Sequence, residues 1–427
     1  MRRRLPTSPA ISTRTRAALL GVAGLTAAAL AAAVALARPE VALDAEPVGS
    51  VLSLPDTPGD HAVWLADFLF RRAALFDADR GDFLGMLSAG VGGIHPLFSP
   101  DRSEIYLPET YYSRGTRGER TDVVTVYDAR RLAPVAEIAI PPKRADVVHG
   151  VALTALLDDG RFLALWNFTP ASSVSVVDVR ARRFVAEIPT AGCGLVYAAG
   201  ARRFAMLCGD GSLLVVSLDE AGDEAGRAVS GPFFDPNADP VTEKAVRRGD
   251  RWLFVSFEGV VHPVDLSGED PVFADTWPLL QADDREARWR IGGSQHLAVH
   301  AASGRLYALV HQGGPHGHKE AGREVWVYDL ERGERLQRIG VPNLMAAFLA
   351  QQMGAQGGLA AWLLDRLVPS PGADSIAVTP DAAPLLLMVS RSAGTVSVHD
   401  ASSGERLRFL EHAGLAPGVL LAPGGPR

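Results

Sequence analysis

Three of the eleven histidines of the chain form its only histidine cluster, which could hold a metal ion. His311, His316 and His318 lie in the sequence HQGGPHGHKEAG, and imidazole groups on a loop can ligate copper or zinc. Their spacing matches no standard metal site, and no further ligands can be assigned to them from other parts of the chain. We therefore expect solvated or hydrogen-bonded loop histidines and no metal bound by this chain.

No catalytic motif accompanies the histidines. The sequence contains no GxSxG, HExxH, P-loop or CxxCH pattern, and no glycine-rich fingerprint that follows a strand. We predict that this chain contributes no catalytic residue and binds no cofactor.

A second polar stretch is dense in charge and directly precedes an expected strand over Val123–Tyr127. Most charge runs are solvated and salt-bridged, which is the default interpretation. Arginines on loops also anchor interfaces, so contact with a partner or a substrate is the alternative. The residues are Arg114, Arg117, Glu119, Arg120 and Asp122.

The two cysteines, Cys193 and Cys208, are expected to form a disulfide. Residues 193–198 and 203–208 are typical of two strands joined by a turn, with the cysteines equidistant from its centre. Facing Cα atoms in an antiparallel pair lie about 4.5 to 5.5 Å apart, within the range that a disulfide accepts. The spacing excludes a CxxC redox motif or a metal pair.

The elements that position these residues follow a repeat. An alternating strand ends at an aspartate, a short turn follows, and an apolar strand returns, as in Val124–Asp128 followed by Val135–Ile138. The unit occurs seven times, at intervals of 41 to 71 residues. The corner aspartates are Asp77, Asp128, Asp178, Asp219, Asp265, Asp329 and Asp400.

Second hairpins lie between the units, as in Pro96–Pro108 and Val151–Trp166. Four strands per unit and seven units predict an all-β fold, a seven-bladed β-propeller over residues 61–427. Helical periodicity between the strands is missing, which disfavours an α/β fold. The strand around His61–Phe68 is expected to complete the last blade and so close the ring.

Residues 342–371 depart from this pattern and lengthen the interval between the last two corner aspartates. Apolar residues recur there at helical spacing, with a break at Gly357-Gly358, which predicts a short helical insert between blades six and seven. The simpler interpretation is a lid packed on the propeller. The alternative is an apolar surface for a partner or a membrane.

Residues 1–37 are typical of a secretory signal peptide. Arginines precede an uncharged run over Ala17–Ala37, which ends in Ala35-Leu36-Ala37. Cleavage there would leave an N-terminal arm over residues 38–60 and an exported protein. A retained membrane anchor is the alternative, because a run of 21 residues can span a bilayer.

The charge of the chain argues against nucleic acid as a partner. Removing residues 1–37 lowers the count of Lys and Arg from 42 to 37, against 49 Asp and Glu, so the net charge changes from −7 to −12. No basic stripe with interleaved aromatic residues is present.

Several of these stretches together resemble the heavy, β-propeller subunit of quinoprotein amine dehydrogenases of the methylamine dehydrogenase type. The best match runs from Ser113-Arg114 through Arg117-Gly118-Glu119-Arg120-Thr121-Asp122 into the strand Val124–Asp128. Further matches are Cys193 with Cys208-Gly209-Asp210-Gly211-Ser212-Leu213, Trp289-Arg290 with Gly292-Gly293, and His318-Lys319 leading to Tyr328-Asp329 and Gly333-Glu334-Arg335-Leu336.

The resemblance implies a periplasmic subunit that scaffolds a small light subunit in an α2β2 heterotetramer. The light subunit would carry tryptophan tryptophylquinone, oxidise a primary amine to aldehyde and ammonia, and pass electrons to a cupredoxin. This chain alone would be inactive. Candidate contacts with the light subunit are Arg114, Arg117, Glu119, Arg120, Asp122, His318 and Lys319.

The sequence departs from the methylamine enzymes in two places. Where they have an aromatic residue at the substrate channel, this chain has Gly92, Gly93 and Ile94. The missing side chain would widen the channel for a larger amine, and the absence of a channel is the alternative. The insert over residues 342–371 is also foreign to the methylamine pattern. A stand-alone exported propeller that binds a ligand or protein without catalysis is the alternative function, and a propeller hydrolase with a central metal is a third.

Overall fold

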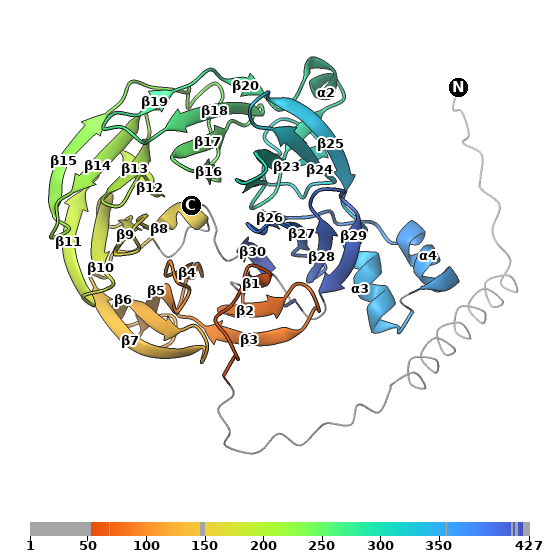
Figure 1. The fold of residues 1–427 in the computed structure, drawn as a ribbon, viewed down its shortest axis with the longest axis horizontal. Helices are drawn as coiled ribbons and strands as arrows, with labels where there is room; N and C mark the ends of the chain where they lie inside the picture. Colours follow the sequence, from red (N-terminus) through yellow and green to blue (C-terminus); the bar gives the residue numbers. More distant parts are fainter. Residues whose placement is uncertain are drawn as a thin grey trace, which may run out of the picture.

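The computed structural model describes residues 53–67, 69–145, 150–355, 357–410, 413–414 and 417–421. The predicted signal peptide and most of the predicted N-terminal arm lie outside these residues. Within them, the strands form seven antiparallel sheets arranged as the blades of a ring (Figure 1). The predicted fold, a seven-bladed β-propeller, is confirmed.

The blades follow one another along the chain. Blades 1 to 3 contain β1 (Ala62–Asp67), β2 (Arg72–Asp77), β3 (Phe83–Ser88) and β30 (Pro417–Leu421); β4 (Leu97–Phe98), β5 (Glu104–Tyr112), β6 (Arg120–Asp128) and β7 (Ala133–Ile140); and β8 (Thr154–Leu156), β9 (Phe162–Asn167), β10 (Ser173–Asp178) and β11 (Arg183–Pro189). Blades 4 and 5 contain β12 (Cys193–Ala198), β13 (Arg203–Cys208), β14 (Leu213–Leu218) and β15 (Glu224–Val229); and β16 (Val246–Arg248), β17 (Arg251–Val255), β18 (Val260–Asp265), β19 (Val272–Phe273) and β20 (Trp277–Pro278). Blades 6 and 7 contain β21 (Trp289–Ile291), β22 (Leu297–His300), β23 (Arg305–Gln312), β24 (Glu324–Asp329) and β25 (Glu334–Gly340); and β26 (Ser375–Val378), β27 (Leu385–Ser390), β28 (Thr395–Asp400) and β29 (Arg406–Leu410).

In the described part of the chain, four short helical segments interrupt the strands. A 3-10 turn over Val151–Leu153 precedes β8, and α2 (Ala282–Glu286) precedes β21. The predicted insert between blades six and seven contains α3 (Leu344–Gln352) and α4 (Gly358–Leu367). No helix in the described ranges is long and apolar enough to cross a bilayer.

The corner aspartates have the same structural role in every repeat, which explains why each repeat contains this residue. In each of the seven units the carboxylate accepts a backbone N–H from the turn that follows, so the side chain fixes the tight turn to the outermost strand. Asp128 is an example, because its Oδ1 accepts from the N–H groups of Arg130 and Arg131 at 2.9 and 2.8 Å.

The apolar core lies between blades rather than in one centre. One buried cluster joins Tyr106 and Val124 of blade 2 to Leu163 and Leu165 of blade 3. Another joins the strands of blade 7 to Val63 and Phe76 of blade 1. Each blade is therefore stabilised by its two neighbours, and the ring must close for every blade to be covered on both faces.

The prediction for ring closure is wrong in its details. The strand around His61–Phe68 does not complete the last blade, because β26 to β29 supply all four strands of blade 7. Instead, β30 from the C-terminal end pairs with β1 through the partners Trp64–Leu421, Leu65–Leu420, Ala66–Val419 and Asp67–Pro417. Blade 1 thus combines a strand from near each end of the described chain.

We expect truncation after residue 416 to destabilise the protein by more than about 3 kcal/mol, because it removes β30 and its four paired positions at about 1 kcal/mol per net hydrogen bond. Urea unfolding followed by tryptophan fluorescence measures the change. Truncation after residue 421 is the control and should be neutral. Equal stabilities for the two truncated chains would contradict this closure.

Candidate functional site

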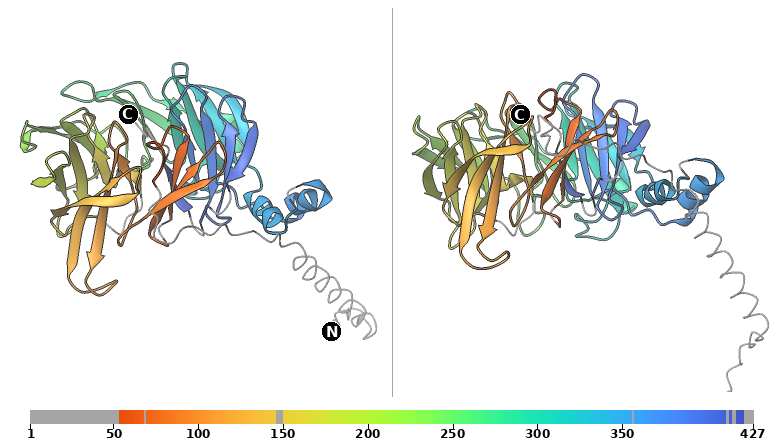
Figure 2. Two further views of the ribbon diagram at one scale, coloured as in Figure 1. Left: turned by 60° about the horizontal axis from the view of Figure 1, so that its bottom comes forward. Right: turned by 90° about the horizontal axis from the view of Figure 1, so that it is seen from below.

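One side of the ring carries most of the residues singled out in the sequence. Neighbouring strands are antiparallel, so the connections between blades and the turn between the second and third strand of each blade lie on the same side. We call this side the connection face. Figure 2 shows the long β5–β6 hairpin projecting beyond the disc on this face.

The predicted channel-wall residues precede β4 on the connection face. The Gly90 N–H donates to Glu109 Oε1 at 2.9 Å and the Val91 N–H donates to the Thr110 carbonyl at 2.7 Å. A Cβ on Gly90 would lie 2.4 Å from the Thr110 carbonyl oxygen, so only glycine allows this approach. The segment is therefore pinned along β5.

The three predicted wall residues differ in exposure. Gly92 is half-buried with a φ of 102°, which favours glycine, whereas Gly93 and Ile94 are buried. The Ile94 side chain belongs to the apolar cluster between blades 1 and 2. Of these three residues, Gly92 alone has exposed surface.

Arg144 connects this segment to the charged stretch. Its guanidinium donates to the Val91 carbonyl at 3.0 Å and to Thr110 Oγ1 at 3.2 Å, and its backbone N–H donates to Asp122 Oδ2 at 3.0 Å. Arg120 holds both oxygens of Asp122 at 2.8 Å and also donates to the Arg144 carbonyl at 2.7 Å. One polar network therefore braces the Gly92 segment.

The charged stretch divides into two parts. Arg120 and Asp122 lie in β6 rather than in the expected loop, and Asp122 is buried, so it can act on a partner only through Arg120. Arg114, Arg117 and Glu119 are exposed at the tip of the β5–β6 hairpin. That tip is closed by Ser113, whose Oγ accepts the Glu119 N–H at 3.0 Å.

Glu109 is a buried carboxyl group directly beneath the Gly92 segment. It accepts the Gly90 N–H and the hydroxyl of Thr125, and burial raises its pKa above the ordinary 4.5. Sequence patterns did not single out this residue, since nothing in β5 distinguishes an inward carboxyl from an outward one.

Four exposed apolar side chains lie in segments that adjoin the braced segment on the connection face. Leu69 and Phe70 follow β1, Tyr111 is the penultimate residue of β5 and Phe168 follows β9, with exposed fractions of 61, 49, 41 and 53%. We call them the apolar arc. Backbone hydrogen bonds join their segments, because the Ala89 N–H donates to the Arg71 carbonyl at 2.7 Å and the Phe168 N–H donates to the Lys143 carbonyl at 3.1 Å. Exposed aromatic clusters of this kind are typical of protein interfaces.

The histidine stretch lies in blade 6, apart from the apolar arc. His311 is buried and its Nε2 donates to the Gly317 carbonyl at 2.8 Å, and the His318 ring stacks on Phe257 with centroids 3.8 Å apart. His316 and Lys319 are exposed. Among the described residues, no group of three or more His, Cys, Asp or Glu side chains could hold a metal ion.

A buried polar pair lies beside these histidines where blades 5 and 6 begin. His296 is fully buried, and Thr242 Oγ1 lies 3.0 Å from its Nε2. Burial lowers the pKa of His296 to about 3, so this ring is neutral at pH 7. Lys244 nearby is also buried and pairs with Glu243 at 2.9 Å. These residues stabilise the start of the inner strands and leave no charged imidazole there.

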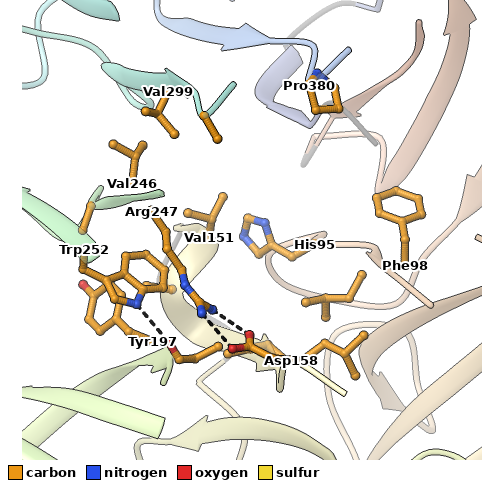
Figure 3. Close-up of a pocket in the computed structure, with 18 of the residues that line it drawn as sticks. His95, Phe98, Val151, Asp158, Tyr197, Val246, Arg247, Trp252, Val299 and Pro380 are labelled. Atoms are coloured by element: carbon orange, nitrogen blue, oxygen red, sulfur yellow. Dashed lines mark hydrogen bonds and ion pairs between the residues drawn. The ribbon is translucent and has the colours of Figure 1, made fainter. Parts of the chain in front are cut away.

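The ring axis contains a cavity of about 820 Å³ that extends toward the side opposite the connection face. Figure 3 shows Arg247 and Asp158 inside it, joined by two hydrogen bonds of 2.6 and 2.7 Å. Trp252 beside them donates to the Ala198 carbonyl at 2.8 Å. The Arg247–Asp158 ion pair therefore links blades 3 and 5 across the cavity wall and has a structural role.

The predicted disulfide between Cys193 and Cys208 is present. The cysteines are direct partners in the β12–β13 register, as the spacing predicted, with Cα atoms 3.9 Å apart. The bond ties the innermost strand of blade 4 to its neighbour.

The fold defines the chain as a seven-bladed β-propeller, and its connection face presents exposed apolar side chains. The family model of the methylamine dehydrogenase heavy chain matches residues 66–352 and 364–423. The chain belongs to this family.

Individual relatives agree with this assignment. The methylamine dehydrogenase heavy chain of Paracoccus versutus is 30% identical over 81% of this chain and 74% of its own length. The heavy chain of Methylorubrum extorquens is 25% identical over 94% of this chain and 90% of its own length.

Solved structures share the fold alone. A dihydro-heme d1 dehydrogenase superposes with a TM-score of 0.50 at 18% identity, over 88% of this chain and 76% of that one. A putative 6-phosphogluconolactonase from Bacteroides fragilis gives 0.54 at 10% identity, over 86 and 99%.

The substitution Glu109→Gln tests the buried carboxyl. A raised pKa means that folding favours the protonated form, so the wild-type protein loses stability as pH rises above the unfolded value of about 4.5. The variant keeps an acceptor for Gly90 without this loss. We expect its stability relative to wild type to increase from pH 4.5 to pH 7, as measured by urea unfolding. Glu119→Gln at the exposed hairpin tip is the matched control, and the same pH trend there would contradict the assignment.

Proposed function

We propose that this chain is the heavy subunit of a periplasmic, tryptophan tryptophylquinone-dependent amine dehydrogenase, in which it scaffolds the quinone-bearing light subunit. The observation that carries the proposal is the apolar arc around the braced Gly92 segment. It offers a partner an exposed aromatic surface at the place where the family resemblance puts the substrate channel.

The apolar arc and the Arg120–Asp122–Arg144 network would have different roles in the complex. Leu69, Phe70, Tyr111 and Phe168 would lose water on docking and supply most of the affinity. The Arg120–Asp122–Arg144 network would hold the Gly92 backbone in place as one wall of the channel. A rigid wall keeps the substrate amine oriented toward the light subunit.

The chemistry would belong to the partner. The light subunit's quinone would accept two electrons from a primary amine, which leaves as aldehyde and ammonia after hydrolysis, and a cupredoxin would take the electrons onward. This chain would position the light subunit and exclude bulk water from the channel. The half-buried Gly92, with no side chain, leaves room there for an amine larger than methylamine.

Co-purification tests the assignment directly. The chain carrying a C-terminal affinity tag, isolated from its native host under gentle conditions, should bring with it a small cysteine-rich protein and the visible absorbance of a quinone. The complex should reduce a dye when supplied with a primary amine, whereas the separated chain should not. Turnover of an amine by the separated chain, or isolation without any partner, would reject the proposal.

The apolar arc itself is tested by Phe168→Asp. A charge at this exposed position should weaken retention of the light subunit at least about tenfold, because an aromatic anchor at an interface centre is worth about 2 kcal/mol or more. The Kd can be measured by biolayer interferometry. Val272→Asp, at an equally exposed apolar position on the outer strand β19, is the control and should bind as wild type. If both variants bind normally, docking occurs elsewhere.

A further inference from the structure

The helical insert between blades 6 and 7 presents a face that nothing in the described chain covers. The helix α3 packs on the ring with Leu344, Ala346 and Ala350 buried, but α4 has no buried residue. Asn343 tethers α4 by donating to the Asp365 and Val368 carbonyls at 3.2 and 2.7 Å. Figures 1 and 2 show both helices standing out from the rim of the disc.

The outward side chains of α4 are apolar and share one side of the helix. Leu359, Trp362, Leu363 and Leu367 have exposed fractions of 71, 53, 40 and 75%, and their spacing of three, four and eight residues follows the helical repeat. Arg366 lies over the Trp362 ring with its guanidinium carbon 5.0 Å from the centroid. Large apolar side chains exposed together in water are unfavourable unless something covers them.

Most of this apolar face lies in residues that the heavy-chain family model does not match. The heavy-chain family model matches residues 66–352 and resumes at residue 364, so it leaves out residues 353–363 and with them the first half of α4. A role shared by all heavy chains therefore does not account for Leu359, Trp362 and Leu363.

Size and charge decide what fits the face. A helix of ten residues is about 15 Å long and can offer a protein partner only a small fraction of the roughly 800 Å² per side that a stable complex buries. A lipid surface has no such requirement, because it needs only apolar side chains that enter the region between headgroups and acyl chains. The insert carries one acid and one base, Asp365 and Arg366, so it is neutral while the whole chain is acidic.

We infer that α4 is a lipid-contacting helix: Leu359, Trp362, Leu363 and Leu367 insert into the surface of a bilayer, with Arg366 able to extend toward the headgroups. The contact is apolar and does not depend on anionic lipid. It would hold the ring at the membrane surface by its rim, at the connection between blades 6 and 7, whereas the apolar arc lies on blades 1 to 3. It does not require the proposed amine oxidation.

Vesicle co-sedimentation tests the inference. The protein used is the chain from residue 38 onward, because residues 17–37 would insert by themselves and every element of the ring lies beyond residue 53. It should sediment with sucrose-loaded phosphatidylcholine vesicles, and raising the salt from about 0.1 M to about 0.5 M should leave the bound fraction unchanged. The double variant Leu359→Glu/Leu367→Glu should lower the partition coefficient at least tenfold.

Two controls make the result decisive. Leu336→Glu places the same charge at an exposed apolar position on the outer strand β25 and should bind vesicles as wild type. Circular dichroism should show the same fold for all variants, since each substitution is at an exposed position. Failure of the wild-type chain to sediment, loss of binding at high salt, or a dimer in analytical ultracentrifugation that the double variant converts to a monomer would each overturn the inference.

Discussion

The pairing of β1 with β30 is the constraint on which the rest of the structure depends. Each blade covers its apolar faces with its two neighbours, so an open ring would leave two blades half covered and one sheet edge unpaired. Closing the ring with strands from near the two ends of the described chain makes the seven blades interdependent. A loop between strands of a closed ring is held at both ends by rigid strands. Such loops can therefore position binding residues accurately.

The architecture was largely readable from the sequence because a local interaction repeats. Each corner aspartate captures the N–H groups of its own turn, and a local rule of this kind leaves the same residue at the same place in every blade. The register shift just before the corner, as between Val126 and Tyr127, recurs in six blades and was not predicted, since a bulge adds no residue type of its own. Which end of the chain closes the ring was predicted wrongly, because β30 pairs across nearly the whole sequence and both terminal segments look like strands.

The site was predicted only in parts. The sequence indicated Gly92 and the pair Arg120 and Asp122 separately, and family resemblance gave them related roles. Their physical link is Arg144, which lies in a connection without periodicity and shows its importance only when three segments meet. The apolar arc was missed for a similar reason. Leu69, Phe70 and Phe168 are apolar residues in short turns between strands, and only the ring brings them to one face.

The separation of apolar surfaces around the ring has a mechanical consequence. The apolar arc spans blades 1 to 3 on the connection face, while α4 stands at the rim between blades 6 and 7. Because the core between blades is closely packed, neither surface can shift without moving the neighbouring blades. The ring therefore holds the two surfaces at fixed positions relative to each other. A chain of this kind can gain a second contact at its rim by inserting two helices in one connection, as at residues 342–371, without disturbing the Arg144 network that braces the first. The insertion costs little folding free energy, since the entropy of closing a connection grows only slowly with its length.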